Sequence, residues 1–487
     1  MNKIRNRDMN YDEFISNGEQ VLRWAANYFE GLESLPVMSQ IKPGDVKDKI
    51  PNSPPLDGES FDEIISDLDK IITPGITHWA HPNFMAYFNS SGSAPGILAE
   101  LIAATYNVNG MVWMSSPAVA ELEEKVLAWF RDSLRISKEF WGVVYDTASV
   151  SSMHAIAAAR ENIPGLEIRE KGMTGRKDLP KLKLYCSTQA HSSIDKACLT
   201  LGIGMDGISH IPVNDRFEMI PEELEKQIKI DIKNGELPFC VVSTIGTTAT
   251  TSVDPVKQIS AISKKYDIWH HVDAAHAGVT AILDEYKNLF DGSESADSIV
   301  INPHKWFFVP IDFSALYIKN RSILKRAFSL VPEYLKTEGG DEITNLMDYG
   351  VPLGRRLRAI KLWFVFRYFG LEGLKLIISN HIASAKWFEE KVKTHPKTKL
   401  FAPVTFSTVC FRYFPNNTYE ETLNQFNKNL VDRINKSGKL FLTGTKINDL
   451  YFIRVVVSGI RTEKRHVESA WELLLSEAQK LENEFEC

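Results

Sequence analysis

The sequence predicts an α/β fold with a mostly parallel central sheet, preceded by an N-terminal helical arm and followed by a small C-terminal α+β domain. The main observation is that short apolar segments typical of strands alternate with helical segments from about residue 141 onward. Parallel strands joined in this way are covered by helices on both faces. We expect the N-terminal arm at 1–85, the large domain with the sheet at 86–370 and the C-terminal domain at 371–487.

The N-terminal region carries Phe14, Val21, Leu22 and Trp24 at helical spacing, which predicts an amphipathic helix within 11–35. A segment punctuated by prolines follows, and then a second helical stretch. These pieces are too thin to enclose a core of their own. We expect them to form an arm that packs on something larger, such as a second subunit.

An aromatic-rich segment, THWAHPNFMAYF, occupies residues 77–88. His78 and His81 have a spacing that occurs in metal sites, but no third ligand lies nearby in the sequence, so we expect structural histidines and no metal. An apolar helix is predicted for 95–104. Another begins after Ser116, with Ser116 at its cap and Pro117 in its first turn.

Six strands and three intervening helices are predicted in the central region. The strands are 142–145, 182–186, 239–245, 268–272, 298–301 and 314–318, and the helices are 154–161, 192–201 and 255–266. Farther on, a long helix is expected at 355–370. The C-terminal region then offers helices at 374–395, 420–437 and 462–484, with β segments at 409–413 and 451–457.

Composition excludes several classes of function. The chain has 487 residues, 44% of them hydrophobic, and a net charge of −6 with both signs interspersed, which gives no electrostatic reason to bind nucleic acid or an anionic membrane. No apolar run is long enough to span a membrane or serve as a signal peptide. The five cysteines lack CxxC spacing, which is typical of a reducing compartment. We therefore expect a cytoplasmic protein.

The segment INPHKW at 301–306 contains the residue around which the predicted site is organised. Lys305 lies within a run, 298–309, that is otherwise typical of a buried strand and its exit loop. A desolvated lysine loses its proton readily, and the neutral amine attacks aldehydes to form a Schiff base. A lysine at a strand end that reaches out to solvent is the ordinary alternative.

Polar groups follow the ends of three other predicted strands. DTASVSS at 146–152 would offer backbone N–H groups and hydroxyls to a phosphate, or simply cap the helix. His191 could stack on an aromatic ring or transfer protons. Asp273 could pair with a protonated ring nitrogen over Ala275, or with a structural arginine. No GxGxxG or P-loop motif is present, so no nucleotide is indicated.

A phosphate site, a stacking histidine, an acid for a ring nitrogen and an amine for an aldehyde together describe a site for pyridoxal 5′-phosphate (PLP). The ends of parallel strands meet at one edge of a sheet, where ligands gather. Each of these features alone has an ordinary structural explanation. Their combination predicts this cofactor.

The chain resembles the group II PLP-dependent decarboxylases, and most of all the aromatic L-amino acid decarboxylases. The resemblance extends from about residue 11 to the C-terminus. The motifs that carry it are THW at 77–79, SPA at 116–118, QAHSS at 189–193, GTT at 246–248, HVDAA at 271–275, NPHKW at 302–306 and PLGRR at 352–356. It implies the fold type I of PLP-dependent transferases, and a homodimer whose active sites lie at the subunit interface.

The resemblance also implies roles for particular residues. The catalytic residues would be Lys305, which holds the cofactor, His191, Asp273 and the loop residue Tyr334, which protonates the product carbon. The cofactor would contact Ala148, Ser149, His191, Thr248, Asp273, Ala275, Asn302, His304 and Lys305. The substrate would contact Trp79, Tyr87, Phe88, Ser90, His191 and Gly354, with Asn109 and Met111 reaching in from the other subunit.

Some positions depart from the family pattern. Asp146 stands where relatives commonly have Gly, Val150 where they have Glu, Asn89 where they have Pro, and His276 where they have an aromatic residue. The expected reaction is the decarboxylation of an L-amino acid, with tryptophan, tyrosine, phenylalanine or their hydroxylated forms favoured by the aromatic segment at 79–88. Asn109 and His276 leave a non-aromatic substrate open.

Two further alternatives use the same scaffold. Aldehyde synthases of this family let oxygen reach the decarboxylated substrate, and they typically lose the loop tyrosine or the stacking histidine. Both residues are kept here as Tyr334 and His191, which favours simple decarboxylation. A catalytically silent relative would have lost the lysine or the aspartate, and neither Lys305 nor Asp273 is missing.

Overall fold

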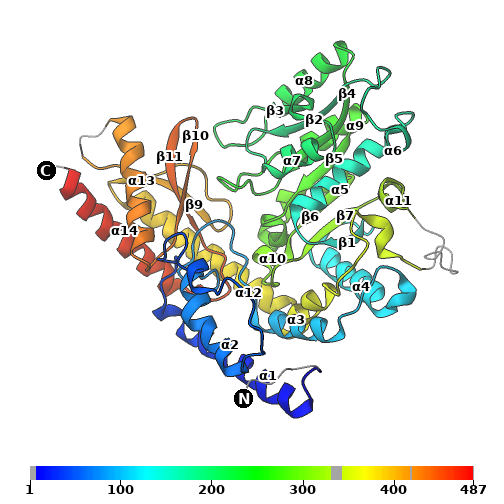
Figure 1. The fold of residues 1–487 in the computed structure, drawn as a ribbon. Helices are drawn as coiled ribbons and strands as arrows, with labels where there is room; N and C mark the ends of the chain where they lie inside the picture. The colour runs from blue at the N-terminus through cyan, green and yellow to red at the C-terminus, as the bar shows by residue number, and fades with distance from the viewer. Residues whose placement is uncertain (1–6, 331–342, 417–418, 486–487) are drawn as a thin grey trace. The chain divides into compact units, whose positions relative to one another are not determined.

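Seven strands form the central sheet of the computed structural model, which describes residues 7–330, 343–416 and 419–485. The strand order is β1-β7-β6-β5-β4-β2-β3 (Figure 1). The strands are β1 (Trp141–Tyr145), β2 (Leu182–Ser187), β3 (Ile208–Ile211), β4 (Leu237–Thr244), β5 (Trp269–Asp273), β6 (Ser298–Ile301) and β7 (Ser314–Ile318). Strands β2 to β6 pair in parallel, whereas β7 is antiparallel to both of its neighbours. The predicted mostly parallel sheet is confirmed.

Helices cover both faces of this sheet. On one face, α5 (Ala148–Glu161) and α7 (Ser193–Thr200) enclose a core that includes Leu184 and Ile156. On the other face, α8 (Pro221–Lys233) and α9 (Val256–Lys265) pack against Tyr185 and Val241. Neighbouring strand residues therefore point to opposite cores, as the two-residue period of a strand requires.

Five further helices belong to the sheet-containing unit. They are α3 (Ala94–Tyr106), α4 (Pro117–Ser133), α6 (Ile168–Lys171), α10 (Pro303–Trp306) and α11 (Arg321–Phe328). Ser116 is at the cap position of α4 and Pro117 in its first turn, as predicted, although the Ser116 side chain makes no capping hydrogen bond.

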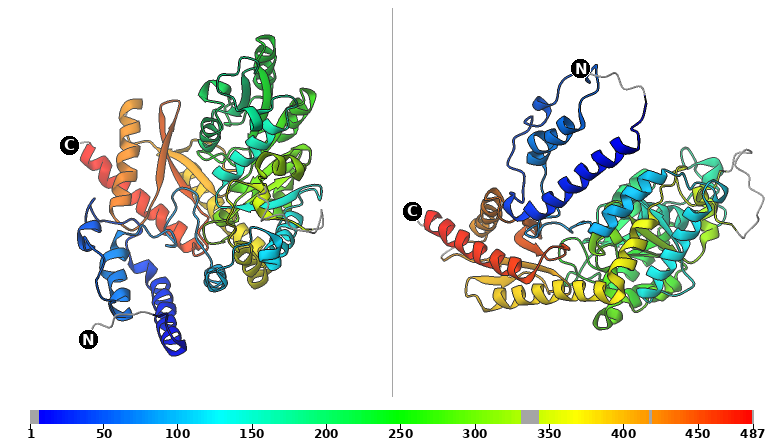
Figure 2. Two further views of the ribbon diagram at one scale, coloured as in Figure 1. Left: turned by 45° about the vertical axis from the view of Figure 1, so that its right-hand side comes forward. Right: turned by 90° about the horizontal axis from the view of Figure 1, so that it is seen from below.

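Contacts divide the chain into two units, each described here by itself. One comprises 90–389 and 400–410, and the other comprises 1–89, 390–399 and 411–487. The second unit contains α1 (Tyr11–Gly31) and α2 (Phe61–Asp67), and its α13 (Glu420–Lys436) and α14 (Lys464–Phe485) pack side by side (Figure 2). A small sheet has the order β10-β11-β9-β8. Its strands are β8 (Thr398–Leu400), β9 (Thr408–Tyr413), β10 (Thr443–Ile447) and β11 (Leu450–Val456).

One local expectation is corrected by the structure. The residues after β6 form a helical turn, α10, and not a loop, since Pro303 is well suited to the first position of a helix. The helices expected at 355–370 and 374–395 are confirmed as the two helical segments of α12 (Ala359–Thr394), which meet at Gly370, whose backbone is non-helical and has a φ of 65° that glycine adopts readily. Among the described helices, none is long and apolar enough to cross a membrane.

Candidate active site

Lys305 lies in the helical turn α10, directly after strand β6 ends at Ile301. Its backbone N–H donates to the carbonyl oxygen of Asn302 at 3.0 Å, and its neighbours His304 and Trp306 are buried. Burial lowers the pKa of the Lys305 amine, and the charge of the Asp273 carboxylate opposes this shift. The amine is therefore easier to deprotonate than an ordinary lysine, as a group that attacks an aldehyde must be.

Asp273 is the last residue of β5, the strand beside β6. Its Cα is paired with that of Val300, so the adjacent parallel strands bring Asp273 and Lys305 to the same edge of the sheet. The side chain is only 6% exposed, and its Oδ1 accepts a hydrogen bond from the backbone N–H of Ala275 at 3.1 Å. A carboxylate can accept several hydrogen bonds, so after this one it can still accept a hydrogen bond from a protonated ring nitrogen.

A buried histidine in β5 supports this acid. His271 lies within hydrogen-bond distance of Ser298 Oγ at 2.8 Å and of Ser152 Oγ at 3.1 Å, and so links β5 to β6 and to α5. Burial lowers the pKa of the His271 imidazole to about 4, against the raising effect of Asp273. The ring therefore stays neutral near pH 7, and Asp273 is left to balance the cationic groups of the site.

His191 lies between strand β2 and helix α7. The backbone N–H of Ser193 donates to Nδ1 of His191 at 3.1 Å, and the Ser193 hydroxyl oxygen lies 2.8 Å from the same nitrogen. Desolvation lowers the pKa of the His191 imidazole, Asp273 opposes this shift, and the positive charge of Lys305 adds to it. The three residues predicted to be catalytic in this part of the sheet thus act on one another electrostatically.

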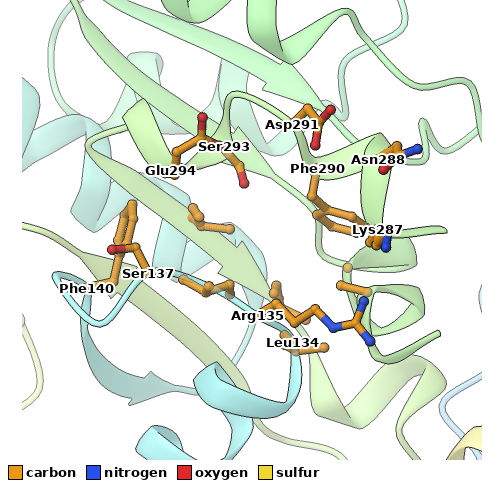
Figure 3. Close-up of a pocket in the computed structure, with 15 residues that line it drawn as sticks. Leu134, Arg135, Ser137, Phe140, Lys287, Asn288, Phe290, Asp291, Ser293 and Glu294 are labelled. Atoms are coloured by element: carbon orange, nitrogen blue, oxygen red, sulfur yellow. The ribbon is translucent and has the colours of Figure 1, made fainter. Parts of the chain in front are cut away.

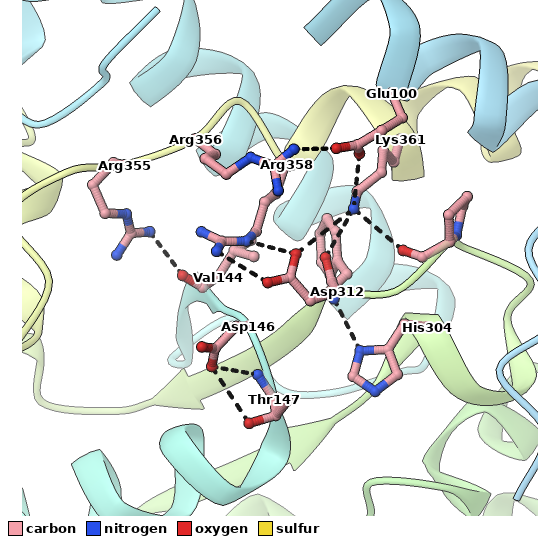
Figure 4. A network of polar contacts seen from close by, with 12 residues as sticks. Glu100, Val144, Asp146, Thr147, His304, Asp312, Arg355, Arg356, Arg358 and Lys361 are labelled. Atoms are coloured by element: carbon pink, nitrogen blue, oxygen red, sulfur yellow. Dashed lines mark hydrogen bonds and ion pairs between the residues drawn. The ribbon is translucent and has the colours of Figure 1, made fainter. Parts of the chain in front are cut away.

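The predicted phosphate site is the N-terminus of α5, which begins at Ala148. The first N–H groups of a helix have no partner within it and attract anions. Ser149 is exposed in that turn. Asp146, by contrast, accepts the backbone N–H of Thr147 at 2.6 Å (Figure 4) and so adds a negative charge beside the anion site. Its presence is therefore unfavourable for phosphate and departs from the family pattern.

Asn302 supplies a sharper test of whether this site fits a phosphate. The backbone N–H of Phe313 donates to Nδ1 of His304 at 2.9 Å, so the neutral ring carries its proton on Nε2 (Figure 4). Burial lowers the pKa of His304 to about 3, with the charge of Lys305 adding to the effect. Nε2 lies 3.4 Å from the Asn302 side-chain amide. That amide is 2% exposed, and its Oδ1 has no hydrogen-bond partner among the described residues.

Exchanging the oxygen and nitrogen of the Asn302 amide resolves this arrangement, since these atoms are distinguished only by their hydrogen bonds. Oδ1 would then accept the Nε2–H of His304, and the NH₂ group would face the position that now lacks a partner. A buried donor of this kind requires an acceptor, and a phosphate oxygen would supply one. The residues present therefore fit the phosphate end of PLP.

The loop after β4 has no room for a side chain at Gly246. Gly246 has a φ of 88°, and a Cβ on it would lie 2.6 Å from the Cβ of Ala277. Thr247 is buried and accepts the backbone N–H of Ser252 at 3.0 Å, whereas Thr248 is exposed. Ala275, which was expected beneath the ring, is 6% exposed.

Three of the predicted substrate residues, Trp79, Tyr87 and Phe88, lie in the unit that comprises 1–89, 390–399 and 411–487. Trp79 stacks on Tyr87 with ring centroids 5.6 Å apart, and the Arg454 guanidinium lies 5.5 Å from the Phe88 ring centroid. Tyr87 has a φ of 51°, an uncommon conformation for a non-glycine residue that often marks functional segments. Ser90 begins the other unit.

Asn109, Met111 and Gly354 are also neighbours. The Asn109 amide lies 3.7 Å from the Met111 sulfur, and its Oδ1 accepts the backbone N–H of Arg355 at 2.9 Å. A Cβ on Gly354 would meet the Asn109 amide at 3.9 Å, within ordinary contact distance. The structure therefore gathers these three residues into one surface.

Arg355 anchors this surface and was not predicted to have such a role. Its guanidinium donates to the carbonyl oxygen of Val144 at 2.8 Å (Figure 4). It also donates to Glu123 Oε1 at 2.9 Å. Both side chains of the ion pair are almost fully buried. The pair joins α4, β1 and the segment that precedes α12, and only the PLGRR motif indicated that this arginine mattered.

A second set of charges fixes the segment that reaches His304. Asp312 accepts two hydrogen bonds from Arg358 at 3.1 Å each, and the Lys361 ammonium donates to the carbonyl oxygens of Pro310 and Asp312 (Figure 4). Phe313 follows directly and supplies the N–H bound by His304. These ion pairs therefore position the histidine beside Asn302.

Tyr334 lies outside the described residues, so its predicted role stays a prediction.

A separate pocket of about 360 Å³ lies between the end of α4 and the residues near β6 (Figure 3). Its lining includes Arg135, Phe140, Lys287 and Ile299, and none of the residues predicted for the cofactor or substrate.

Comparison with known proteins identifies the family. Residues 43–414 match the model of the pyridoxal-dependent decarboxylase conserved domain. This chain belongs to that family. PLP is accordingly the cofactor for which Lys305, Asp273 and the phosphate site are suited, and the chain is an enzyme of the carboxy-lyase type.

Individual relatives are similar over almost their whole length. Tyrosine decarboxylase 2 of Narcissus pseudonarcissus is 37% identical over 482 residues, which is 97% of this chain and 95% of that protein. Phenylacetaldehyde synthase of Arabidopsis thaliana is 36% identical over 485 residues, 98% of each chain. The crystal structure of Oryza sativa TDC with PLP and tryptamine superposes with a TM-score of 0.94 at 33% identity, covering 98% of this chain and 100% of that one. The predicted fold type is thereby confirmed.

Proposed function

We propose that this enzyme decarboxylates aromatic L-amino acids, releasing the corresponding amine and CO₂. The observation that carries the proposal is the placement of a desolvated Lys305 amine beside the Asp273 carboxylate, at the edge of the sheet where His191 and the N-terminus of α5 also lie. The choice of an aromatic substrate is supported by Trp79, Tyr87 and Phe88. It is supported further by the relatives, whose names refer to tyrosine, phenylacetaldehyde and tryptamine.

When bound, PLP supplies an aldehyde for the substrate amine and a ring that accepts the electrons released as CO₂ leaves. Lys305 would hold the cofactor until substrate arrives. Asp273 would keep a proton on the ring nitrogen, and its burial makes that charge effective because little water screens it. His191 would lie over the ring and hold the substrate carboxylate, with its Nδ1 occupied by Ser193 and its Nε2 free to donate.

The subunit arrangement is part of the same proposal. Residues 1–85 would wrap around a second copy of the chain, and the homodimer would act in the cytoplasm. Exposed apolar side chains on α1, among them Phe14, Val21 and Leu22, support such a role. Asn109 and Met111 would then contribute to the partner's substrate pocket, and Tyr334 would protonate the product carbon.

A second candidate function is aldehyde synthesis, in which O₂ oxidises the decarboxylated substrate and aldehyde, ammonia and hydrogen peroxide are released. The similarity to phenylacetaldehyde synthase favours considering it. His191 and Tyr334 are both present, which favours the amine. Purified enzyme given L-tryptophan, L-tyrosine or L-phenylalanine should release CO₂ and amine in equal amounts, without peroxide. Release of hydrogen peroxide in the same molar amount as CO₂ would show that the enzyme is an aldehyde synthase and not a simple decarboxylase.

The role of Lys305 is tested by Lys305→Ala and Lys305→Arg. Both variants should lose the visible absorption of the bound cofactor and all turnover, because a guanidinium keeps the charge but cannot attack the aldehyde. Circular dichroism should show an intact fold. Turnover in either variant at the level of the unmodified enzyme would refute the proposal.

A further inference from the structure

Three side chains with metal-binding atoms meet beside helix α7, apart from the residues assigned to PLP. They are Cys186 of β2, Asp195 of α7 and His210 of β3, and their ligand atoms all lie within 4.8 Å of one another. Among the described residues, this is the one group of three or more potential metal ligands that meets this distance.

The sheet itself brings the thiol and the imidazole together. Strands β2 and β3 pair in parallel, with Cys186 and His210 as Cα partners. Both belong to the face that α7 covers, because Leu184 and Ile208, two residues before each of them, pack in the same core as Ile194 of α7. The strand register therefore fixes two ligands on one side of the sheet.

Helix α7 brings the third ligand. Asp195 lies in the first turn of α7, and its Oδ1 is 3.0 Å from Nε2 of His210. The Asp195 and His210 side chains are 28% and 38% exposed, whereas Cys186 is fully buried. An ion could therefore enter from solvent past the carboxylate and imidazole and reach the thiol beneath them.

We infer that Cys186, Asp195 and His210 form a binding site for one Zn²⁺ ion, with water as the fourth ligand. Zn²⁺ prefers four-coordinate sites built from sulfur, imidazole nitrogen and carboxylate oxygen, which are the three ligand types present. As the metal–sulfur bond forms, the Cys186 thiol gives up its proton to solvent, and no electron is transferred. The ion joins β2, β3 and α7, close in sequence to His191.

An ordinary ion pair between His210 and Asp195 above a buried cysteine is the competing explanation. Zinc binding would replace the direct contact of 3.0 Å between Asp195 and His210 by bonds from both to the ion. Since all three ligand atoms already lie within 4.8 Å of one another, this requires only small movements of the side chains. His210 and Asp195 retain exposed surface and so have room to move. Metal binding to the whole enzyme decides between the two explanations.

The experiment uses the PLP-loaded enzyme, stripped of metal with a chelator and dialysed against Zn²⁺ alone. We expect one Zn²⁺ per chain by metal analysis. X-ray absorption at the zinc edge should show one sulfur at about 2.3 Å. Neither measurement depends on which amino acid the enzyme decarboxylates, so failure of the proposed function would not affect them.

Single substitutions test the contribution of each of the three ligands to zinc binding. Cys186→Ala should abolish the bound Zn²⁺, and His210→Gln and Asp195→Asn should each weaken binding at least tenfold. Cys240→Ala is the matched control, since Cys240 is an equally buried strand cysteine outside the cluster. His210→Gln changes a partly exposed side chain and keeps the test valid if Cys186→Ala does not fold. A metal-free enzyme, a zinc edge without sulfur, or equal binding in His210→Gln would overturn the inference.

Discussion

The backbone N–H of Ser193 donates to Nδ1 of His191 at 3.1 Å, and the Ser193 hydroxyl oxygen lies 2.8 Å from the same nitrogen. A backbone N–H can only donate, so Nδ1 is an acceptor and a neutral imidazole carries its proton on Nε2. The orientation of His191 is therefore set by the first turn of α7, and not by the cofactor alone.

Ser193→Ala should hold the His191 ring less firmly in this orientation, but the backbone N–H of residue 193 would still donate to Nδ1. We expect kcat/KM to fall about tenfold, equivalent to about 1.4 kcal/mol for one hydrogen bond. The pKa of His191 should rise, because a donor to the neutral ring is lost. The pH profile of kcat/KM measures both effects. Ser192→Ala is the control, since Ser192 makes no capping hydrogen bond. Identical profiles for the two variants would contradict the proposed orientation.

Asp273→Asn should lower kcat about a thousandfold or more, because a neutral amide cannot hold the proton on the ring nitrogen. The same change should lower the pKa of Lys305, since the carboxylate now raises it. Steady-state kinetics measures the first effect, and the pH dependence of amine labelling in the cofactor-free enzyme measures the second. Asp267→Asn, just before β5 and exposed, is the control. A variant with near-normal turnover would remove Asp273 from this role.

Much of the sheet could be predicted because several of its strands, such as β1, β6 and β7, are short and largely apolar segments. Strand β3 was missed, since Ile208–Ile211 is short and contains a serine and a histidine. The break within α12 was predicted, because Gly370 has the sequence appearance of a helix end and its backbone is non-helical in the structure.

The site was predictable where its residues follow strand ends, as Asp273 and Lys305 do. Contacts between distant segments were not. Nothing in the sequence near Glu123 indicates that its carboxylate binds Arg355, 232 positions away. The orientation of His304 likewise depends on Phe313 and on the ion pairs around Asp312, which only the folded chain brings together.

Arg355→Met should destabilise the enzyme by about 3–5 kcal/mol, because it leaves Glu123 buried without its cation. The double variant Arg355→Met/Glu123→Gln should recover part of this loss. Urea unfolding of the PLP-loaded enzyme measures the difference. Arg356→Met is the matched control, because its ion pair with Glu100 is largely exposed and such pairs contribute about 0–1 kcal/mol. Equal losses for the two arginines would show that burial of the pair does not matter.

Acid should destabilise the fold because β5 contains two adjacent buried histidines, His270 and His271. Burial lowers the pKa of His270 to about 3 and that of His271 to about 4, whereas both should titrate near 6.5 in the unfolded chain. Below about pH 6.5 the unfolded state therefore binds protons that the folded state does not. Stability is fully present above that pH and is lost as the pH falls through the folded pKa values.

Each histidine should contribute a slope of up to about 1.4 kcal/mol per pH unit between pH 6.5 and the folded pKa. Urea unfolding at a series of pH values, with a fixed excess of PLP, measures the slope. His270→Asn keeps a polar side chain between Ser243 and Ser260, which contact the histidine at 2.7 and 2.9 Å, but removes the titrating group. The variant should be less stable at pH 7 and should lose stability less steeply on acidification. An unchanged slope would mean that His270 is already protonated in the folded enzyme.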